Sequence, residues 1–134
     1  MAEYTLTLNS DQARAVLSSV DLLMRLKINQ PEELIWYLLD VGEGDFCTRR
    51  DEARPHLRLA FEVFFRDKQT GKDELWYRLY NLYQVLRKAV HDAEHPETTG
   101  VDSYEPLRFT DEPLPQCEWE NSGNKGTVPY RYKS

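Results

Sequence analysis

The spacing of apolar residues changes within the first thirty positions of the chain. Residues 4–8, Tyr-Thr-Leu-Thr-Leu, alternate polar and apolar side chains, which predicts a short half-buried strand. From Ser10 to about Lys27 an apolar stripe repeats at helical spacing opposite a polar face. Asn9, with Gln12 three residues later, predicts a capping box at the start of this helix. The chain therefore opens as a strand followed by a helix.

Proline marks the start of two further predicted helices. Residues 29–33 join a capping amide, a proline and two acids, and an apolar repeat of helical spacing follows until glycines stop it. Pro55 suits the first turn of a third helix that runs from Pro55 to about Asp67. Residues 57–65 also alternate in part, so a hairpin strand is the alternative, and we favour the helix.

The strongest helical pattern runs from Asp73 to Glu94, where apolar residues recur every three or four positions and a proline follows. Frequent prolines exclude a long helix beyond this point. Residues 104–109 and 117–119 predict short strands that could pair with the N-terminal strand. Residues 121–134 are polar and contain glycine, which predicts a flexible tail.

These elements predict a mainly helical α+β fold, with about four helices and a small antiparallel sheet from the N-terminal strand and the C-terminal short strands. The 134 residues suit a single domain over residues 1–120, long enough to bury a core without disulfides or a metal. We find no secretory signal, no apolar run near the roughly 20 residues of a membrane span, and only two cysteines. We therefore expect a cytoplasmic protein with reduced thiols and no cofactor.

Charge separates one segment from the rest of the chain. The formal net charge of −6 argues against general DNA or RNA binding, which needs a broad basic face. Yet residues 48–58, TRRDEARPHLR, contain four arginines. If a helix begins at Pro55, Arg54 lies at its N-terminus. Free backbone N–H groups and guanidinium groups together suit a phosphate or pyrophosphate there. The alternative is a set of surface ion pairs with the neighbouring acids Asp51, Glu52 and Glu62.

Catalytic motifs give little support for an enzyme. The sequence has no nucleophile elbow, no zinc-protease motif and no phosphate-binding glycine loop. Cys47 lies near two arginines that could lower its pKa, but a half-buried cysteine without a role is the simpler interpretation. His91 and His95 share a helix face and could bind zinc with a third ligand, or could simply favour the helix dipole. We expect neither catalysis nor a metal site.

Binding residues are easier to find. Asn81 lies beside Tyr77 and Tyr80 on the long helix, and an aromatic platform with a side-chain amide can stack on and read a purine. Core packing explains most of these aromatic residues equally well, and Asn81 alone would be a solvated helix residue. Arg25 lies on the polar face of the first helix, with Asp21 one turn before it as a surface partner.

Four stretches also carry a likeness to a known family. They are LNSDQARAVLSSVDLLMRLKINQPEEL, EARPHL, YNLYQVLRKAV and SYEPLRFTDEPLP, and the likeness runs from about Thr5 to Pro115. Together they resemble the Thoeris anti-defence proteins of the first type, a family of small phage proteins.

The resemblance implies a function that composition cannot. Members of that family are sponges, which bind the cyclic ADP-ribose isomers (glycocyclic forms, gcADPR) made by the TIR proteins of bacterial Thoeris defence. They sequester this messenger without cleaving it, so the downstream effector is not activated. Some members also bind cyclic oligonucleotides at separate sites, which makes cyclic di- and trinucleotides further candidate ligands. The family assembles as a homohexamer, a trimer of dimers with ligand pockets between subunits, and acts in the cytoplasm of the infected bacterial host.

The resemblance further implies which arginines contact the ligand. Arg25 in LMRL and Arg54 in EARP match the phosphate-contacting arginines of the family. Arg108 in PLRFT matches a C-terminal arginine, although the spacing before it differs. Arg58 stays open between a phosphate contact and a surface charge.

A polar and an aromatic residue complete the implied site. Asn81 in YNLYQV matches a polar pocket residue, and the family places an aromatic ring shortly before it. Because the connection DKQTGKDE is shorter than the family's, either Trp76 or Tyr77 serves as that ring.

A different class of function fits the acidic net charge as well. The protein could be an inhibitor that binds a host defence factor through its acidic surface.

Overall fold

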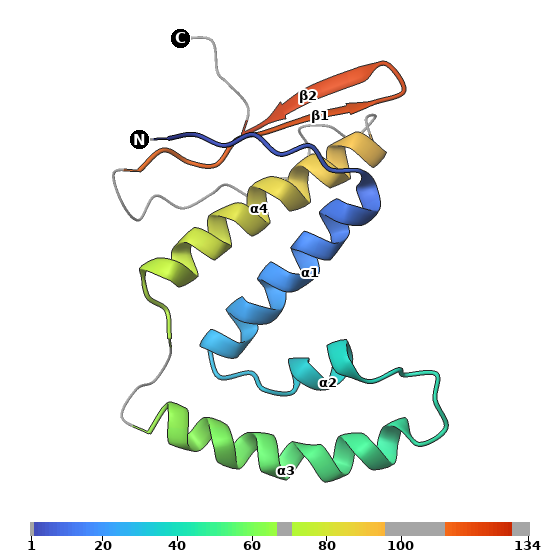
Figure 1. Cartoon of the computed structure of the whole chain (residues 1–134), viewed down its shortest axis with the longest axis vertical. Helices are drawn as coiled ribbons and strands as arrows, with labels where there is room; N and C mark the ends of the chain where they lie inside the picture. Colours follow the sequence, from blue (N-terminus) through green and yellow to red (C-terminus); the bar gives the residue numbers. More distant parts are fainter. Residues whose placement is uncertain (1, 67–70, 96–111, 130–134) are drawn as a thin grey trace.

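The structure of the chain is a computed structural model that describes residues 2–66, 71–95 and 112–129. In these ranges it contains four helices and two strands, arranged as a mainly helical α+β fold (Figure 1). The elements in chain order are α1 (Ser10–Lys27), α2 (Glu33–Leu38), α3 (Phe46–Phe64), α4 (Glu74–Glu94), β1 (Cys117–Asn121) and β2 (Asn124–Val128). The predicted fold class and the four helices are confirmed.

Helix α1 begins with the predicted capping box. The backbone N–H of Gln12 donates to Asn9 Oδ1 at 2.8 Å, and the backbone N–H of Asn9 donates to Gln12 Oε1 at 3.0 Å. Each residue therefore satisfies a backbone donor that the first turn of a helix leaves without an intrahelical acceptor. This local chemistry explains why the sequence predicted the start of α1 correctly.

Helices α1 and α4 pack side by side and run in opposite directions (Figure 1). Arg14, near the start of α1, forms an ion pair with Glu94 at the end of α4. At the other end, Lys27 Nζ lies 2.9 Å from Asp73 Oδ2, and Asp73 is the residue that caps α4. Ion pairs thus join α1 and α4 at both ends, and the packing of these two helices forms the frame of the fold.

The C-terminal hairpin covers the second half of α4. Strands β1 and β2 are antiparallel, and Val128 packs with Val85 and Ala89 of α4 in the buried core. Half-buried Cys117 and Trp119 of β1 extend this core. The hairpin thus closes the core at the C-terminal end of α4.

The hairpin corrects the prediction of a flexible tail from residue 121 onward, because residues 124–128 form β2. Its turn has positive φ at Ser122 (51°) and Gly123 (87°), which is the geometry that matches the twist of a two-residue hairpin. Gly126 faces Trp119 across the ladder, and any side chain there would collide with the indole ring. The polar composition of residues 124–128 did not predict a strand, because β2 is stabilised by the packing of Trp119 and Val128.

The predicted N-terminal strand is wrong in the described part of the chain. Residues 2–9 are not assigned to a strand, and β1 pairs only with β2 among the described residues. Alternation indicates which side chains share a face, but a strand also needs a neighbouring edge for its backbone. The predicted strand at residues 104–109 lies outside the described residues.

Helix α3 is longer than predicted and begins at Phe46, so Pro55 lies inside it rather than in its first turn. The hairpin alternative for residues 57–65 is wrong. The start was missed because Asp45, the residue before the helix, makes no side-chain capping bond, whereas Pro55 gave a false start signal.

Helix α3 is also the least packed of the four described helices. It lies across the molecule beyond α2 and away from α4 (Figure 1). Its described contacts include the ring of Phe46 against Trp36, with centroids 5.5 Å apart, and an ion pair between Arg58 and Glu32. No extensive packing joins α3 to another described helix or strand.

Candidate functional site

Arg54 lies in the middle of α3, which corrects the prediction of an anion site at a helix N-terminus. Backbone N–H groups in a helix interior already donate to the carbonyl four residues earlier, so they are not available to a phosphate. What remains at this position is the guanidinium itself. Its side chain is exposed and forms no ion pair with any residue that the structure describes.

The other arginines of the cluster are paired, as the surface alternative predicted, although mostly with different acids. Arg49 Nε lies 2.6 Å from Asp45 Oδ2, and Arg50 Nε lies 3.2 Å from Asp51 Oδ1. Arg58 pairs with Glu32 across the gap to α2. Among the four arginines of TRRDEARPHLR, Arg54 is therefore the one whose charge stays uncompensated by described residues.

Arg25 is in the last turns of α1 and takes part in a small polar network. Its Nε lies 3.4 Å from Asp21 Oδ1, the partner predicted from the sequence, and its Nη1 donates to Gln30 Oε1 at 3.1 Å. Asp21 Oδ2 also accepts from the Tyr37 hydroxyl at 3.1 Å. Burial raises the pKa of Tyr37, and the hydrogen bond to Asp21 raises it further, so the hydroxyl keeps its proton. An anion at Arg25 would have to compete with the half-buried carboxylate of Asp21 and with the amide oxygen of Gln30.

Trp76 is enclosed in an aromatic cluster at the start of α4. Its ring stacks on Tyr80 with centroids 5.5 Å apart and meets Tyr77 edge-on at 5.1 Å. Lys72 Nζ lies 4.9 Å from the centroid of the same ring. With only 8% of its surface exposed, Trp76 has no open face for a purine. Tyr77 is half-buried and is the better candidate of the two predicted rings.

The indole N–H of Trp76 is a buried donor without an acceptor. Such a group costs about 1–3 kcal/mol relative to a paired one. It is therefore a donor that a bound ligand or a small rearrangement of the cluster could satisfy.

Asn81 is buried, which corrects the interpretation of a solvated helix residue. Its amide belongs to a polar stripe along one face of α4 that also holds Gln84, Lys88 and Asp92, all of them buried. Lys88 Nζ lies 3.9 Å from Asp92 Oδ1, and Asp92 is fully buried. The sequence analysis missed this stripe because polar residues on an amphipathic helix are normally assigned to the solvent side. The sequence shows only the helical spacing of these four polar residues, and their burial becomes visible in the structure alone.

The predicted site residues are distributed over three helices. Arg25 is on α1, Arg54 and Arg58 are on α3, and the Trp76–Asn81 segment is on α4, while Arg108 lies outside the described residues. Figure 1 shows α3 well separated from α4. A single copy of the chain does not bring the α3 arginines to the aromatic cluster.

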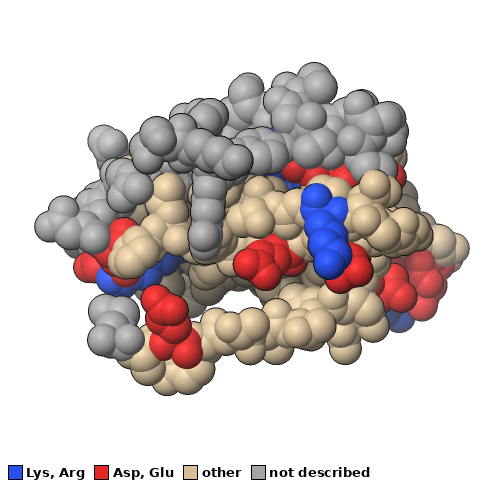
Figure 2. Space-filling view, turned by 90° about the horizontal axis from the view of Figure 1, so that it is seen from above, with Lys and Arg blue, Asp and Glu red and all other residues tan. Residues whose placement is uncertain are grey.

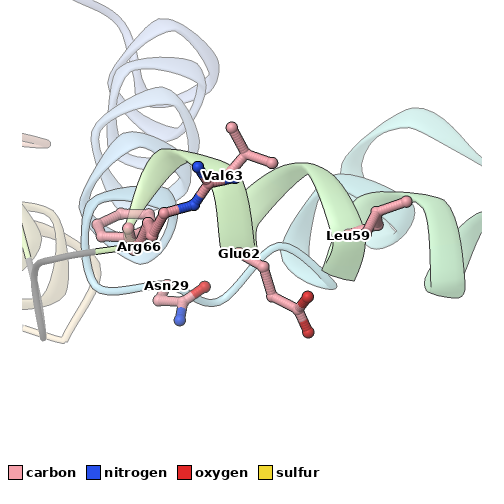
Figure 3. A pocket seen from close by; sticks show the side chains of 6 residues that line it. Asn29, Leu59, Glu62, Val63 and Arg66 are labelled. Atoms are coloured by element: carbon pink, nitrogen blue, oxygen red, sulfur yellow. The ribbon is translucent and has the colours of Figure 1, made fainter.

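A cavity of about 460 Å³ lies elsewhere, between α3 and the loop after α1. Its walls contain none of the predicted site residues and comprise Asn29, Leu59, Glu62, Val63, Phe65 and Arg66 (Figure 3). Glu62 lies in the last turn of α3 and Arg66 lies two residues beyond its end, and their side chains extend in different directions (Figure 3). The carboxylate of Glu62 and the guanidinium of Arg66 therefore do not converge on a common ligand position.

The histidine and cysteine candidates have ordinary surroundings. The rings of His91 and His95 lie 5.1 Å apart, and His91 Nδ1 is 3.4 Å from Asp92 Oδ1. The described residues contain no cluster of three side chains able to hold a metal ion. Cys47 is exposed rather than half-buried, and burial raises the pKa of the Cys117 thiol.

On the face that Figure 2 shows, acidic and basic side chains of the described residues lie scattered among other residues. None of the described helices combines the length and the apolar character that crossing a membrane requires. No known protein family, curated protein or solved structure matches this chain. The likeness to the Thoeris anti-defence proteins therefore depends on its sequence motifs alone.

Proposed function

We propose that this protein binds a TIR-derived cyclic ADP-ribose isomer and sequesters it without cleavage, in the cytoplasm of an infected bacterial host. In this role it would act as a phage sponge that blocks Thoeris immune signalling. Cyclic di- and trinucleotides are a second ligand class under the same proposal. The sequence motifs suggest the ligand, and the geometry supports a binding role through one observation in particular.

That observation is the uncompensated guanidinium of Arg54. The three other arginines of the segment each pair with a carboxylate: Arg49, Arg50 and Arg58. Arg54 has no such partner among the described residues, so its donors are available to an anion. Guanidinium binds phosphate through two parallel charge-assisted hydrogen bonds, which are stronger than neutral ones.

Self-association is part of the same proposal, because one copy leaves the candidate residues apart. Exposed apolar side chains gather on α2, α3 and the loop between them, and they are Trp36, Leu38, Val41, Leu59, Val63 and Phe64. Apolar groups of this size on a poorly packed helix are typical of a surface that another chain covers. We propose a homohexamer, built as a trimer of dimers, in which α3 of one copy supplies Arg54 to a pocket shared with its neighbour.

Calorimetry with cyclic ADP-ribose isomers tests the proposal. We expect saturable binding at submicromolar concentration, and intact ligand should be released after heat denaturation of the complex. Because a charge-assisted hydrogen bond contributes about 1.5–3 kcal/mol, Arg54→Glu should weaken binding by roughly tenfold to a hundredfold or more. Asn81→Ala should weaken it as well, through the loss of a buried amide.

Arg49→Glu is the matched control, since it makes the same charge change on the same helix at a residue that already has a partner. Equal losses from Arg49→Glu and Arg54→Glu would mean that helix charge, and not a contact, controls affinity. Recovery of a hydrolysed nucleotide would replace sequestration with catalysis.

A second candidate function is the protein-binding inhibitor of a host defence factor. Exposed Trp36 and Leu38 lie beside the acidic residues Asp40 and Glu43, and aromatic side chains with a charged rim are typical of protein interfaces. A stable complex with a host protein that survives Arg54→Glu would favour this function over nucleotide binding.

A further inference from the structure

The N-terminal segment, residues 2–8, has the pattern of a strand but no strand partner in the described chain. Tyr4 is 93% exposed and Leu6 is 76% exposed, although both lie on the apolar side of the alternation. Each Å² of apolar surface left in water costs about 25 cal/mol relative to burial. Burial of these two large side chains, which share one side of the alternation, would therefore stabilise a contact made by this segment.

The hairpin offers a complementary edge. It has two strands, so β1 has one edge whose backbone groups pair with no described strand. Side chains of β1 also alternate: Cys117 and Trp119 are half-buried, while Glu118 and Glu120 are exposed. A strand added along this edge would place apolar side chains beside Cys117 and Trp119.

The N-terminal segment matches that edge in length and in chemistry. Tyr4 to Leu8 covers five residues, the same length as β1. Tyr4, Leu6 and Leu8 would extend the apolar face, and the intervening threonines would lie beside the glutamates without a like-charge contact.

A second copy of this chain is the occupant that the geometry favours. In its own chain the segment ends at Asn9, which the capping box holds at the start of α1. From that fixed end the segment leaves Tyr4 and Leu6 in solvent. The segment and the hairpin lie at the same end of the molecule, so two copies that meet there can exchange segments reciprocally (Figure 1).

We propose that residues 2–8 form an exchanged strand on β1 of a second copy. The proposal rests on the self-association proposed above and names one of its contacts. A stable interface buries roughly 1,200–2,000 Å², more than two short strands supply, so the exchange adds to the apolar surface of α2 and α3.

Disulfide trapping tests the exchange without any nucleotide, using Cys117 of β1 as the reporter. Three variants, Tyr4→Cys, Leu6→Cys and Leu8→Cys, are each made with Cys47→Ser and oxidised in the full chain. These three positions cover the possible registers on the apolar face. We expect at least one to give a disulfide-linked dimer on a non-reducing gel, whereas Thr5→Cys, on the other face, should give none.

Several results would overturn the exchange. Equal dimer from Thr5→Cys would show random collision, a disulfide within one chain would show pairing with the chain's own β1, and free thiols in all three variants would show no pairing. A deletion of residues 2–8 keeps the Asn9 cap and should raise the dissociation constant of self-association at least tenfold in sedimentation. An unchanged constant also contradicts the proposal, and circular dichroism verifies that the helices persist. Loss of messenger binding with trapping intact would remove the proposed function alone.

Discussion

Gly71 shows how a single position holds the two long helices together. It lies just before α4, where its backbone N–H donates to the carbonyl oxygen of Lys27, at the end of α1, at 2.6 Å. A Cβ atom at Gly71 would lie 2.6 Å from the same oxygen, closer than real Cβ atoms approach backbone. The close approach of the loop before α4 to the end of α1 therefore requires glycine at this position.

Gly71→Ala should destabilise the protein, because the backbone of the loop or of α1 must move to admit the methyl group. Forced contacts of this kind typically cost about 1–3 kcal/mol. Thermal or urea unfolding measures the loss. Gly44→Ala is the control, since nothing lies within 4 Å of a Cβ built there. An equal effect at both positions would show that the contact with Lys27 is unimportant.

The Lys27–Asp73 pair beside Gly71 makes a prediction about pH. The hydrogen bond from Lys27, and then the backbone N–H of Trp76, hold the pKa of the Asp73 carboxyl below its ordinary value. A lowered pKa in the folded state means that this pair stabilises the fold above the ordinary carboxyl pKa. That contribution is lost as the pH falls through the lowered value.

Lys27→Met should move the pKa of Asp73 upward in a carboxyl NMR titration. It should also shrink the stability difference from the parent protein as the pH falls below about 4. Lys125→Met, at an exposed lysine of β2, is the control and should leave the Asp73 titration unchanged. An unmoved Asp73 titration in Lys27→Met would assign the lowered pKa to the helix cap alone.

At the scale of the element, α4 carries two different faces that both end up buried. Val85 and Ala89 pack under the hairpin, and the polar stripe from Asn81 to Asp92 is buried too. A buried ion pair contributes little net stability, but removal of one member leaves a charge without compensation. The Lys88–Asp92 pair is therefore the sensitive point of α4.

Asp92→Asn should destabilise the protein by about 3–5 kcal/mol, the usual effect of breaking a buried pair. Chemical denaturation with circular dichroism measures this change. Asp11→Asn, at a side chain that is 98% exposed on α1, is the matched control and should have almost no effect. A loss below about 1 kcal/mol for Asp92→Asn would mean that Lys88 finds adequate compensation without this carboxylate.

At the scale of the whole molecule, α3 is the helix on which the proposed self-association depends. A helix of 19 residues gains most of its stability from packing, yet only Phe46 and Phe61 of α3 are buried. Phe64 remains 69% exposed near its end. Assembly with other copies would bury these side chains and would bring the Arg54 guanidinium to a neighbour.

Val63→Glu combined with Phe64→Glu should therefore shift the protein toward monomer in sedimentation or light scattering. Thr48→Glu, an exposed polar position on the same helix, is the control for added charge. Nucleotide affinity should fall together with assembly if the pocket lies between subunits. An unchanged mass in the double variant would remove the α2 and α3 surface from the interface.

The elements that depend on local chemistry were predictable from the sequence. Helix α1 has its capping box and α4 has Asp73 as its cap, so both were placed within a residue of their observed ends. For the candidate site, the sequence predicted which residues take part but not where they lie or how deeply they are buried. The position of Arg54 within α3, the enclosure of Trp76 and the burial of Asn81 depend on neighbours that are remote in sequence.

Tertiary structure decided which segments pair as strands and which side chains are buried, because both depend on contacts between residues that are remote in sequence. A polar stretch became β2 since Trp119 and Val128 could pack, and an alternating stretch at residues 4–8 stayed unpaired since no described edge receives it. The sequence by itself determined the mainly helical class, the acidic charge and an arginine cluster beside a proline. Within that cluster, only the fold separated Arg54, which pairs with no described carboxylate, from three arginines that do, because ion pairing depends on which side chains meet in space.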